Sequence, residues 1–329
     1  MRDVAEVSGL SLQTVSRVAN GEPNVNDATR ERVLDVMREL GYRPNLAARA
    51  MRRGSFKTIG IVYQGLHAVG TRRTVESVSE HAAHAGYATT LMPIDAATRF
   101  SASGAFTRLE EMAVDVMVVI VTSAAELDSR LQVPRGVPVI VLGPQLSPEV
   151  SAITADIEVG ESEALRYVLG LGHETVHHIT GALDSFFARR REEVWREVLA
   201  AEGRRIPPPV EADWTAHSGY LAMKRLLDAP EWERPTAVFC ANDQSALGAY
   251  RAIREAGLRI PEDVSVIGFD DIEEAVDFSP PLTTIAQDWD LLGQEMMRVA
   301  QEMLAGAPPQ ELLLPTRLVV RDSVAPPRR

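Results

Sequence analysis

Two polar side chains near the start of the chain, Gln13 and Arg17, lie four residues apart and would share one face of a helix. A glutamine can form two hydrogen bonds with an adenine edge, and an arginine can do the same with guanine N7 and O6. Leu12, beside them in the sequence, suits contact with a thymine methyl group. These residue types at this spacing predict the reading of DNA base edges, although an ordinary solvated helix face would look similar in isolation.

Two short helices must position these side chains. Residues 3–20 form two apolar-periodic segments around a Ser8-Gly9 turn, and four residues are predicted to face inward: Val4, Ala5, Val15 and Val18. A third helix is predicted over residues 27–40, with Asn26 as N-cap, Gly41 at its end and apolar residues at helical spacing: Ala28, Val33, Leu34, Met37 and Leu40. The pattern predicts a helix-turn-helix whose second helix lies in the DNA major groove. Four polar residues are expected to contact phosphates: Thr14, Ser16, Asn20 and Asn26.

The charge distribution agrees with contact to nucleic acid at one end. The chain has a net charge of −12, but residues 1–57 hold ten Lys and Arg against seven Asp and Glu, which leaves −15 for the remainder. A small basic module on an acidic body fits a protein of which one end meets phosphates. Residues 46–53 are rich in helix formers but too short to form a stable helix alone, so DNA is the expected partner that stabilises them.

Length and composition restrict the class of protein. A chain of 329 residues suggests two or three domains, and 45% hydrophobic with 24% charged residues is typical of a soluble globular protein. There is no stretch of about 18 uncharged apolar residues, which predicts no membrane span. The N-terminus does not have the pattern of a secretory leader, and the single Cys240 excludes an internal disulfide. We therefore expect a cytoplasmic protein.

From residue 57 on, strands and helices alternate. The ten predicted strands are 58–63, 87–92, 114–122, 137–143, 152–156, 177–181, 236–241, 264–269, 282–285 and 317–320, and the helical patterns are 72–85, 159–171, 186–203, 216–229, 244–257 and 288–304. Most strands are continuous β-branched runs, typical of parallel sheets buried on both faces. This order predicts an α/β core of two doubly wound parallel-sheet subdomains, with a ligand site at the carboxyl ends of the strands.

One pattern suggests a metal site. His173-Glu174-Thr175-Val176-His177 matches HExxH, which holds zinc when one helix presents both histidines on one face. Gly170 and Gly172 end the preceding helix, and residues 176–179 begin a strand, so the two histidines would lie too far apart. The sequence also has no nucleophile elbow, Walker loop or dinucleotide fingerprint. We expect no catalytic residue, no metal and no cofactor, and hence no enzyme.

Five ordered segments carry a resemblance to a known family: DVAEVSGLSLQTVSRV (3–18), GYRPNLAAR (41–49), ANDQSALGA (241–249), DVSVIGFDD (263–271) and PPLTTIAQD (280–288). The whole chain resembles the LacI/GalR family of transcriptional regulators. The resemblance implies a helix-turn-helix headpiece over 1–44, a hinge helix over 45–56, and a core like that of periplasmic sugar-binding proteins over 57–329. One core subdomain would comprise about 57–156 and 287–315, and the other about 157–286 and 316–325. A homodimer on a pseudo-palindromic, double-stranded operator is also implied.

The resemblance further implies site residues. Positions 12, 13 and 17 would read the operator, while Ala48 and Met51 would enter the minor groove, where Met51 could wedge into the central base step. Five residues match effector contacts of sugar-responsive members: Arg191, Trp214, Asn242, Asp270 and Trp289. Three further residues are second candidates: Phe187, Gln244 and Gln287. Indole faces stack on a sugar ring, and the polar groups bond its hydroxyls. Core packing is the alternative for either tryptophan, and another arginine of the run 189–191 is the alternative to Arg191.

Departures from the family pattern bear on function. Gly143 stands where an acidic sugar contact is implied, and Phe187 where a small polar residue is implied, which puts a galactoside in doubt. The chain begins two residues before Asp3, without the usual cap of the first helix, a loss on the order of 1 kcal/mol. It also ends without a tetramer-forming helix, so a dimer is expected. The predicted function is that of a repressor released by a sugar-type inducer; a corepressor-dependent regulator and a sugar-binding transport protein are the alternatives.

Overall fold

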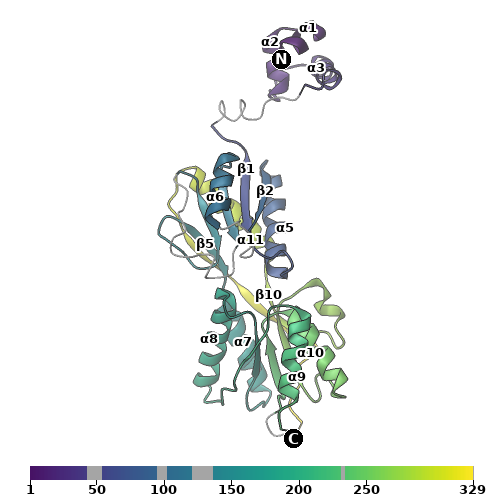
Figure 1. The fold of residues 1–329 in the computed structure, drawn as a ribbon, viewed down its shortest axis with the longest axis vertical. Helices are drawn as coiled ribbons and strands as arrows, with labels where there is room; N and C mark the ends of the chain where they lie inside the picture. Colours follow the sequence, from purple (N-terminus) through teal and green to yellow (C-terminus); the bar gives the residue numbers. More distant parts are fainter. Residues whose placement is uncertain (43–53, 95–101, 121–135, 231–233, 329) are drawn as a thin grey trace. The chain divides into compact units, whose positions relative to one another are not determined.

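The chain folds into two compact units, Met1–Lys57 and Thr58–Arg329, which can be followed by colour in Figure 1. The structure, a computed structural model, describes residues 1–42, 54–94, 102–120, 136–230 and 234–328. The expected hinge positions Ala48 and Met51 lie outside the described residues. None of the described helices is both long enough and apolar enough to cross a membrane.

Three helices form the first unit: α1 (Arg2–Ser8), α2 (Leu12–Ala19) and α3 (Asp27–Glu39). The turn between α1 and α2 passes through Gly9, whose φ of 65° lies in the left-handed region. Side-chain caps begin the next two helices, since Ser11 accepts from the Thr14 N–H and Asn26 from the Thr29 N–H. The helix-turn-helix and the third helix with its Asn26 cap are therefore confirmed.

A small apolar core closes this unit, made by Val4, Val15, Val18, Ala19, Val33, Val36 and Met37. Of the residues predicted to face inward along the first two helices, Ala5 is half-buried and the three valines are buried. Of the apolar residues noted along the third helix, Val33 and Met37 are buried, whereas Ala28 is exposed and Leu34 and Leu40 are 42% and 46% exposed. The buried stripe of α3 consists of Val33, Val36 and Met37. Leu34 lies about 100° from Val33 around the helix, and Leu40 is the C-cap beyond the last turn.

Two six-stranded sheets form the second unit. The first has the order β11-β5-β4-β3-β1-β2, with β1 (Thr58–Tyr63), β2 (Ala88–Pro93), β3 (Val116–Ile120), β4 (Val139–Leu142), β5 (Ser151–Ala155) and β11 (Glu311–Leu314). The second has the order β12-β10-β9-β8-β6-β7, with β6 (His177–Thr180), β7 (Val210–Glu211), β8 (Ala237–Cys240), β9 (Ser265–Asp270), β10 (Thr283–Gln287) and β12 (Thr316–Val319). The described pairings are parallel except that of β10 with β12, which confirms two doubly wound sheets.

Helices cover both faces of each sheet. α5 (Val69–His84) and α11 (Trp289–Leu304) pack on one face of the first sheet, and α6 (Ala102–Glu111) packs on the other. On the second sheet, α7 (Ile157–Gly170) and α8 (Phe186–Ala201) lie on one face, with α9 (Ala216–Leu227) and α10 (Asp243–Glu255) on the other (Figure 1). A short 3-10 helix, η2 (Glu273–Asp277), precedes β10. Each face has its own apolar cluster, as strands buried on both sides require.

Four of the described elements escaped the sequence prediction. The ten predicted strands are present with ends within two residues of the predicted ones, but β7, β11, α6 and η2 were not predicted. β7 has two residues at the edge of its sheet. β11 is an edge strand of sequence Glu-Leu-Leu-Leu. Its residues do not alternate between apolar and polar and include no β-branched type, so the sequence carries no strand signal there.

The chain crosses between the two sheets three times, after β5, after β10 and after β11. The first and third crossings lie side by side, because the Asp156 N–H donates to Leu314 O at 2.7 Å and Thr316 Oγ1 donates to Asp156 O at 2.7 Å. Gly160, in the first turn of α7, faces this junction, where a Cβ would lie 2.3 Å from Thr316 Oγ1 and 2.7 Å from Ile285 Cγ2. The missing side chain at position 160 therefore lets α7 pack directly on the crossing strands.

The substitution Gly160→Ala should destabilise the chain, because its methyl group meets β10 and β12 closer than atoms tolerate. Overpacking of this kind costs about 1–3 kcal/mol, so we expect a lower Tm in thermal unfolding followed by circular dichroism. Gly170→Ala on the same helix is the matched control, since no described atom lies within 4 Å of a Cβ there. The control should keep or slightly raise Tm through its helix propensity. Equal effects of the two substitutions would contradict the packing at the crossings.

Candidate functional site

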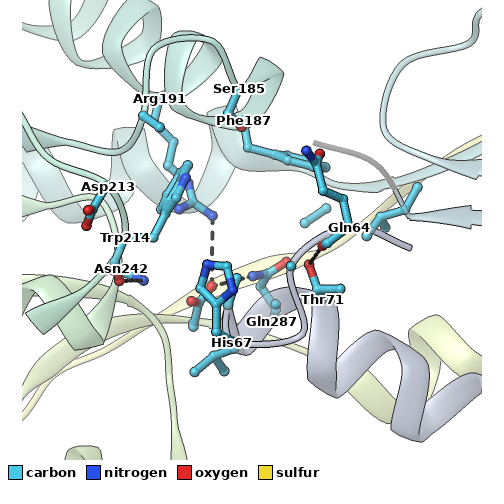
Figure 2. Close-up of a pocket in the computed structure, with 18 of the residues that line it drawn as sticks. Gln64, His67, Thr71, Ser185, Phe187, Arg191, Asp213, Trp214, Asn242 and Gln287 are labelled. Carbon is cyan, nitrogen blue, oxygen red and sulfur yellow. Dashed lines mark hydrogen bonds and ion pairs between the residues drawn. The ribbon is translucent and has the colours of Figure 1, made fainter. Parts of the chain in front are cut away.

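A cavity of about 290 Å³ lies in the second unit, at the carboxyl ends of strands from both sheets (Figure 2). Gln64 follows β1, Asn242 follows β8, and Asp270 and Gln287 end β9 and β10. This edge is where the strand order predicted a ligand site. The lining residues are Gln64, Gly65, His67, Ala68, Val69, Gly70, Thr71, Leu142, Ala155, Ala182, Asp184, Ser185, Phe187, Arg191, Asp213, Trp214, Asn242, Asp270, Gln287 and Trp289.

The structure brings seven of the eight expected effector residues to this cavity and leaves Gln244 out of its lining. Gln244 is the second residue of α10, and a rotation of about 100° per helical residue turns it away from Asn242, the N-cap that lines the cavity. Sequence reasoning missed six polar lining residues: Gln64, His67, Thr71, Asp184, Ser185 and Asp213. Their places just after a strand or at the start of a helix are the signal that could have found them.

Arg191 brings a buried guanidinium to the cavity wall. It projects from α8 and is 5% exposed. Its Nη1 donates to Ala241 O, its Nη2 lies 3.9 Å from Asp270 Oδ1, and its Cζ lies 3.6 Å from the centre of the Phe269 ring. Burial lowers the pKa of Arg191, and the neighbouring carboxyl groups, among them Asp270 and Glu161, oppose that shift. The wall thus holds the positive charge of Arg191, which Ala241 O and the Asp270 carboxyl group already offset in part.

Among the residues for which the sequence left alternatives, Arg191 and both tryptophans line the cavity. Arg189 is exposed and Arg190 pairs with glutamates on the helix surface, Glu158, Glu193 and Glu197, so Arg191 is the member of the run that lines the cavity. Both Trp214 and Trp289 are half-buried and line the cavity. Trp289 also packs on the apolar cluster of the first sheet, so it serves the core as well.

Asp270 supplies a buried carboxyl group beside Arg191. It ends β9 with a φ of 114°, and its Oδ1 accepts from Gln287 Nε2 at 2.7 Å. Burial raises the pKa of Asp270 to about 6, although Arg191 and Gln287 both favour the ionised form. An ionised carboxylate accepts hydrogen bonds from ligand hydroxyls, and its protonated form can donate one.

Asn242 and Trp214 fix each other at the cavity wall. Asn242 Nδ2 donates to Trp214 O at 3.0 Å, and Asn242 Oδ1 accepts from the Ser245 N–H at 2.9 Å as the cap of α10. Trp214 has a φ of 73°, unusual for a large side chain, and its indole lies on Gly181, where a Cβ would come within 2.3 Å of the ring. Such a backbone persists because the surrounding contacts determine it, which indicates a fixed orientation of the indole.

The wall from the first sheet is mainly apolar. Leu142 and Ala155 end β4 and β5, and Phe187 approaches this side from α8 (Figure 2). Gly143 has a φ of 133°, and a Cβ there would lie 3.9 Å from Phe187 Cζ. The implied acidic contact at position 143 is therefore replaced by a glycine with an aromatic ring in front of it.

Two helices begin at the cavity without a side-chain cap. α5 starts at Val69 after Ala68, α8 starts at Phe186 after Ser185, and neither N-cap side chain bonds the first turn among the described residues. Ser185 Oγ is buried and has no hydrogen-bond partner within the described part of the chain. Helix N-termini have free N–H groups and a partial positive charge. The two termini and Ser185 therefore offer donors to the oxygen atoms of a ligand.

A second buried acid, Glu161 of α7, interacts with Arg191 without lining the cavity. Neither carboxyl oxygen of Glu161, nor Arg191 Nε, has a hydrogen-bond partner among the described residues. Burial raises the pKa of Glu161 well above its usual range, against the opposite effects of Arg191 and Arg190. His178 of β6 also lies near Arg191, and burial lowers its pKa to about 3. Arg191 thus interacts with the buried acid Glu161, which does not line the cavity, and lies near the neutral His178.

The HExxH pattern does not form a zinc site geometry. His173 lies between α7 and β6, where its ring nitrogens are each 2.9 Å from a partner, Thr236 Oγ1 and Ala325 O. His177 is in β6, so the two histidines do not share a helix face, as predicted. No group of His, Cys, Asp and Glu in the described ranges could hold a metal ion. His173 instead ties the C-terminal segment to the second sheet.

The first unit presents the polar face expected from the sequence. The three residues predicted to read bases are exposed: Leu12, Gln13 and Arg17. Among those predicted to contact phosphates, the Thr14 and Ser11 hydroxyls lie 2.9 Å apart, and Asn20 Nδ2 donates to Ser16 Oγ at 3.3 Å. A helix-turn-helix with such a face, in one chain with a two-sheet unit that has a cavity at its strand ends, defines the class of ligand-responsive DNA-binding regulators.

Comparison with known proteins agrees with this class. A family model described as bacterial regulatory proteins, lacI family, matches residues 1–45, and one described as a periplasmic binding protein-like domain matches residues 165–324. The lactose operon repressor of Escherichia coli (strain K12) is 33% identical over 99% of this chain and 90% of its own length. The transcriptional repressor PurR of Mannheimia succiniciproducens is 31% identical over 98% of each chain. The chain therefore belongs to the lacI family of bacterial regulatory proteins.

Solved structures resemble the chain over almost its full length. A Lac repressor bound to ONPG in the repressed state has a TM-score of 0.88 and 32% identity, with 98% of each chain covered. The complex of the transcriptional regulator CelR with cellobiose has a TM-score of 0.72 and 30% identity, again with 98% of each chain covered.

The substitution Glu161→Gln should stabilise the chain at neutral pH. Below the usual pKa of glutamate both folded and unfolded chains carry the proton, so variant and wild type should unfold alike. As the pH rises, the unfolded chain releases the proton first, so the wild type loses stability until the raised folded-state pKa is passed. We expect the free energy of unfolding of the variant to exceed that of the wild type by on the order of 1–3 kcal/mol near pH 7. This is comparable to the cost of leaving one buried polar group without a hydrogen bond.

Urea unfolding at several pH values measures this difference. Glu163→Gln, on the same helix but exposed, is the control and should stay within about 0.5 kcal/mol of the wild type at every pH. A Glu161→Gln variant that is less stable than the wild type at neutral pH would show that Glu161 is ionised and needed there.

Proposed function

We propose that the chain is a sequence-specific transcriptional regulator, a repressor whose binding to double-stranded operator DNA is controlled by a small sugar or glycoside. The observation that carries this proposal is the cavity wall on which Arg191, Asp270 and the Trp214 indole meet. The guanidinium Cζ lies 5.5 Å from the centre of that indole and the Nη2 atom 3.9 Å from the carboxyl group. Relatives with a similar fold have been solved with ONPG and with cellobiose, which supports a sugar-type effector.

The wall combines the two kinds of contact that a sugar needs. Trp214 and Trp289 offer flat aromatic faces for the apolar C–H side of a sugar ring. Arg191, Asn242 and Asp270 offer donors and acceptors for its hydroxyl groups, and a site with such buried groups rejects analogues that lack a hydroxyl. We propose seven effector residues: Phe187, Arg191, Trp214, Asn242, Asp270, Gln287 and Trp289. A cavity of about 290 Å³ is at the lower end of the range for small-molecule sites, which favours a small glycoside.

The first unit supplies the DNA contacts in this proposal. Leu12, Gln13 and Arg17 would read base edges, and four residues would bind phosphates: Thr14, Ser16, Asn20 and Asn26. The hinge positions Ala48 and Met51 would contact the minor groove, with Met51 as the wedge. Relatives were solved as a dimer bound to operator, which supports a homodimer on a pseudo-palindromic site. Light scattering that gives the mass of one chain would contradict the homodimer.

Two other functions share parts of this site. A corepressor-dependent regulator would use the same cavity with the opposite sign of coupling, and the sign has to be measured. A sugar-binding transport protein would need the second unit alone, and the helix-turn-helix unit counts against it. We propose no enzymatic activity, in keeping with relatives that are named as repressors.

Sugar and DNA should affect each other's binding equally. A thermal-shift screen of mono- and disaccharides, with ONPG and cellobiose included, should yield a sugar that raises Tm. That sugar should weaken binding to a duplex selected from a random pool, and the duplex should weaken binding of the sugar by the same factor, about 5–150-fold. Titration calorimetry and fluorescence anisotropy measure the two factors.

The variant Arg17→Ala is the control, since it should bind the selected duplex more weakly and bind the sugar unchanged. A sugar that strengthens duplex binding would establish the corepressor alternative. If no sugar in the screen shifts Tm, the sugar-type effector is contradicted.

A further inference from the structure

The turn after α2 brings one acidic residue beside a residue of the DNA-reading face. Asn20 is the C-cap of α2, and Gly21 follows with a φ of 70°. The Gly21 N–H donates to Val18 O and the Glu22 N–H to Arg17 O, both at 3.0 Å. This is the Schellman arrangement, in which the residue two places after the C-cap contacts the residue three places before the C-cap. Glu22 is therefore placed next to Arg17 by the backbone.

The pair that meets here differs from the usual one. A Schellman turn commonly joins two apolar side chains at these positions. In this chain the pair is a glutamate and an arginine, with Glu22 Oε2 3.7 Å from Arg17 Nε. Two further features restrict Glu22: an Nη atom of Arg30 on α3 donates to Glu22 O at 2.6 Å, and the following Pro23 favours an extended backbone. The backbone of Glu22 is thus held to the folded part of the unit, beside α2.

The geometry leaves the two Nη atoms of Arg17 available for DNA. Because the carboxylate approaches Nε, the two Nη atoms stay available for guanine N7 and O6, which need a two-pronged donor. A carboxylate at this position also repels phosphates, which penalises contacts that carry no sequence information. Both side chains are about half exposed, 47% and 50%, so the ion pair itself contributes little to stability. Its effect should be on the choice of DNA sequence.

We propose that Glu22 determines specificity by positioning Arg17 for a guanine edge and by disfavouring phosphate contacts. This inference rests on the proposed function, in which Arg17 reads a base. Glu22 makes no base contact of its own in this account; it acts through Arg17. Removal of its charge should therefore widen the range of sequences that the chain binds.

The test uses the full-length chain and duplexes selected from a random pool. The base pair that loses its preference in Arg17→Ala marks the position read by Arg17. Dissociation constants are then measured for the selected duplex, for duplexes altered at that position, and for an unrelated duplex, at two salt concentrations. Four proteins are compared: wild type, Glu22→Gln, Arg17→Ala and the double variant. Glu39→Gln is the charge-matched control, since Glu39 is exposed on α3 and has no ion pair among the described residues.

We expect Glu22→Gln to lower the discrimination against altered duplexes about fivefold to tenfold and to tighten binding to the unrelated duplex. In the Arg17→Ala background the same substitution should change discrimination less than twofold. The control Glu39→Gln should leave discrimination unchanged, and thermal unfolding should show all variants folded.

Two results would overturn the inference. If Glu22→Gln strengthens binding to every duplex by one factor, with and without Arg17, the residue acts as a plain charge. If discrimination stays at the wild-type value, Glu22 does not position Arg17. A wild-type chain that selects no preferred sequence would instead contradict the proposed function, and the role of Glu22 with it.

Discussion

The burial of one guanidinium group organises the cavity-bearing unit of this protein. A cation removed from water is tolerated where hydrogen bonds and opposite charges replace its hydration. Around Arg191 these come from the carbonyl of Ala241 after β8, and from the ring of Phe269 and the carboxyl of Asp270 on β9. Helix α8 and the second sheet must both be in place before the charge is balanced. The polar wall of the cavity is therefore built by folding of the second sheet and does not wait for a ligand.

The two walls of the cavity differ in polarity, which bears on how a ligand could control the arrangement of the two sheets. The charged groups Arg191 and Asp270 lie on the side of the second sheet, whereas the first sheet contributes apolar residues such as Leu142 and the uncapped start of α5. A ligand that stacks on the indole rings, forms hydrogen bonds through its hydroxyl groups and accepts from the N–H groups at the starts of α5 and α8 must contact both sheets. The crossings that join the sheets are held together at Asp156 and Gly160. If the two sheets can adopt more than one arrangement, a ligand between them favours the arrangement in which its contacts are stronger.

Sequence patterns predicted most of the fold because the strands are buried on both faces and rich in β-branched residues. They failed where local patterns are weak, at the two-residue β7 and the leucine-rich β11. The resemblance to a family led to Arg191, Trp214 and Asp270, which a periodicity alone would not single out. Ser185 and Glu161 remained hidden because one is a polar residue before a helix and the other resembles an exposed first-turn acid. Their significance depends on which neighbours tertiary structure brings near.

The proposal that Arg191 and Asp270 recognise the effector as one unit can be decided by a double-mutant cycle. Titration calorimetry with the sugar found by screening would compare wild type, Arg191→Lys, Asp270→Asn and the double variant. We expect each single substitution to weaken binding at least about tenfold, as for one partner of a buried pair, and the double variant to bind about as weakly as either one. Losses that add up independently, or single variants that bind like the wild type, would show that the two residues do not act together.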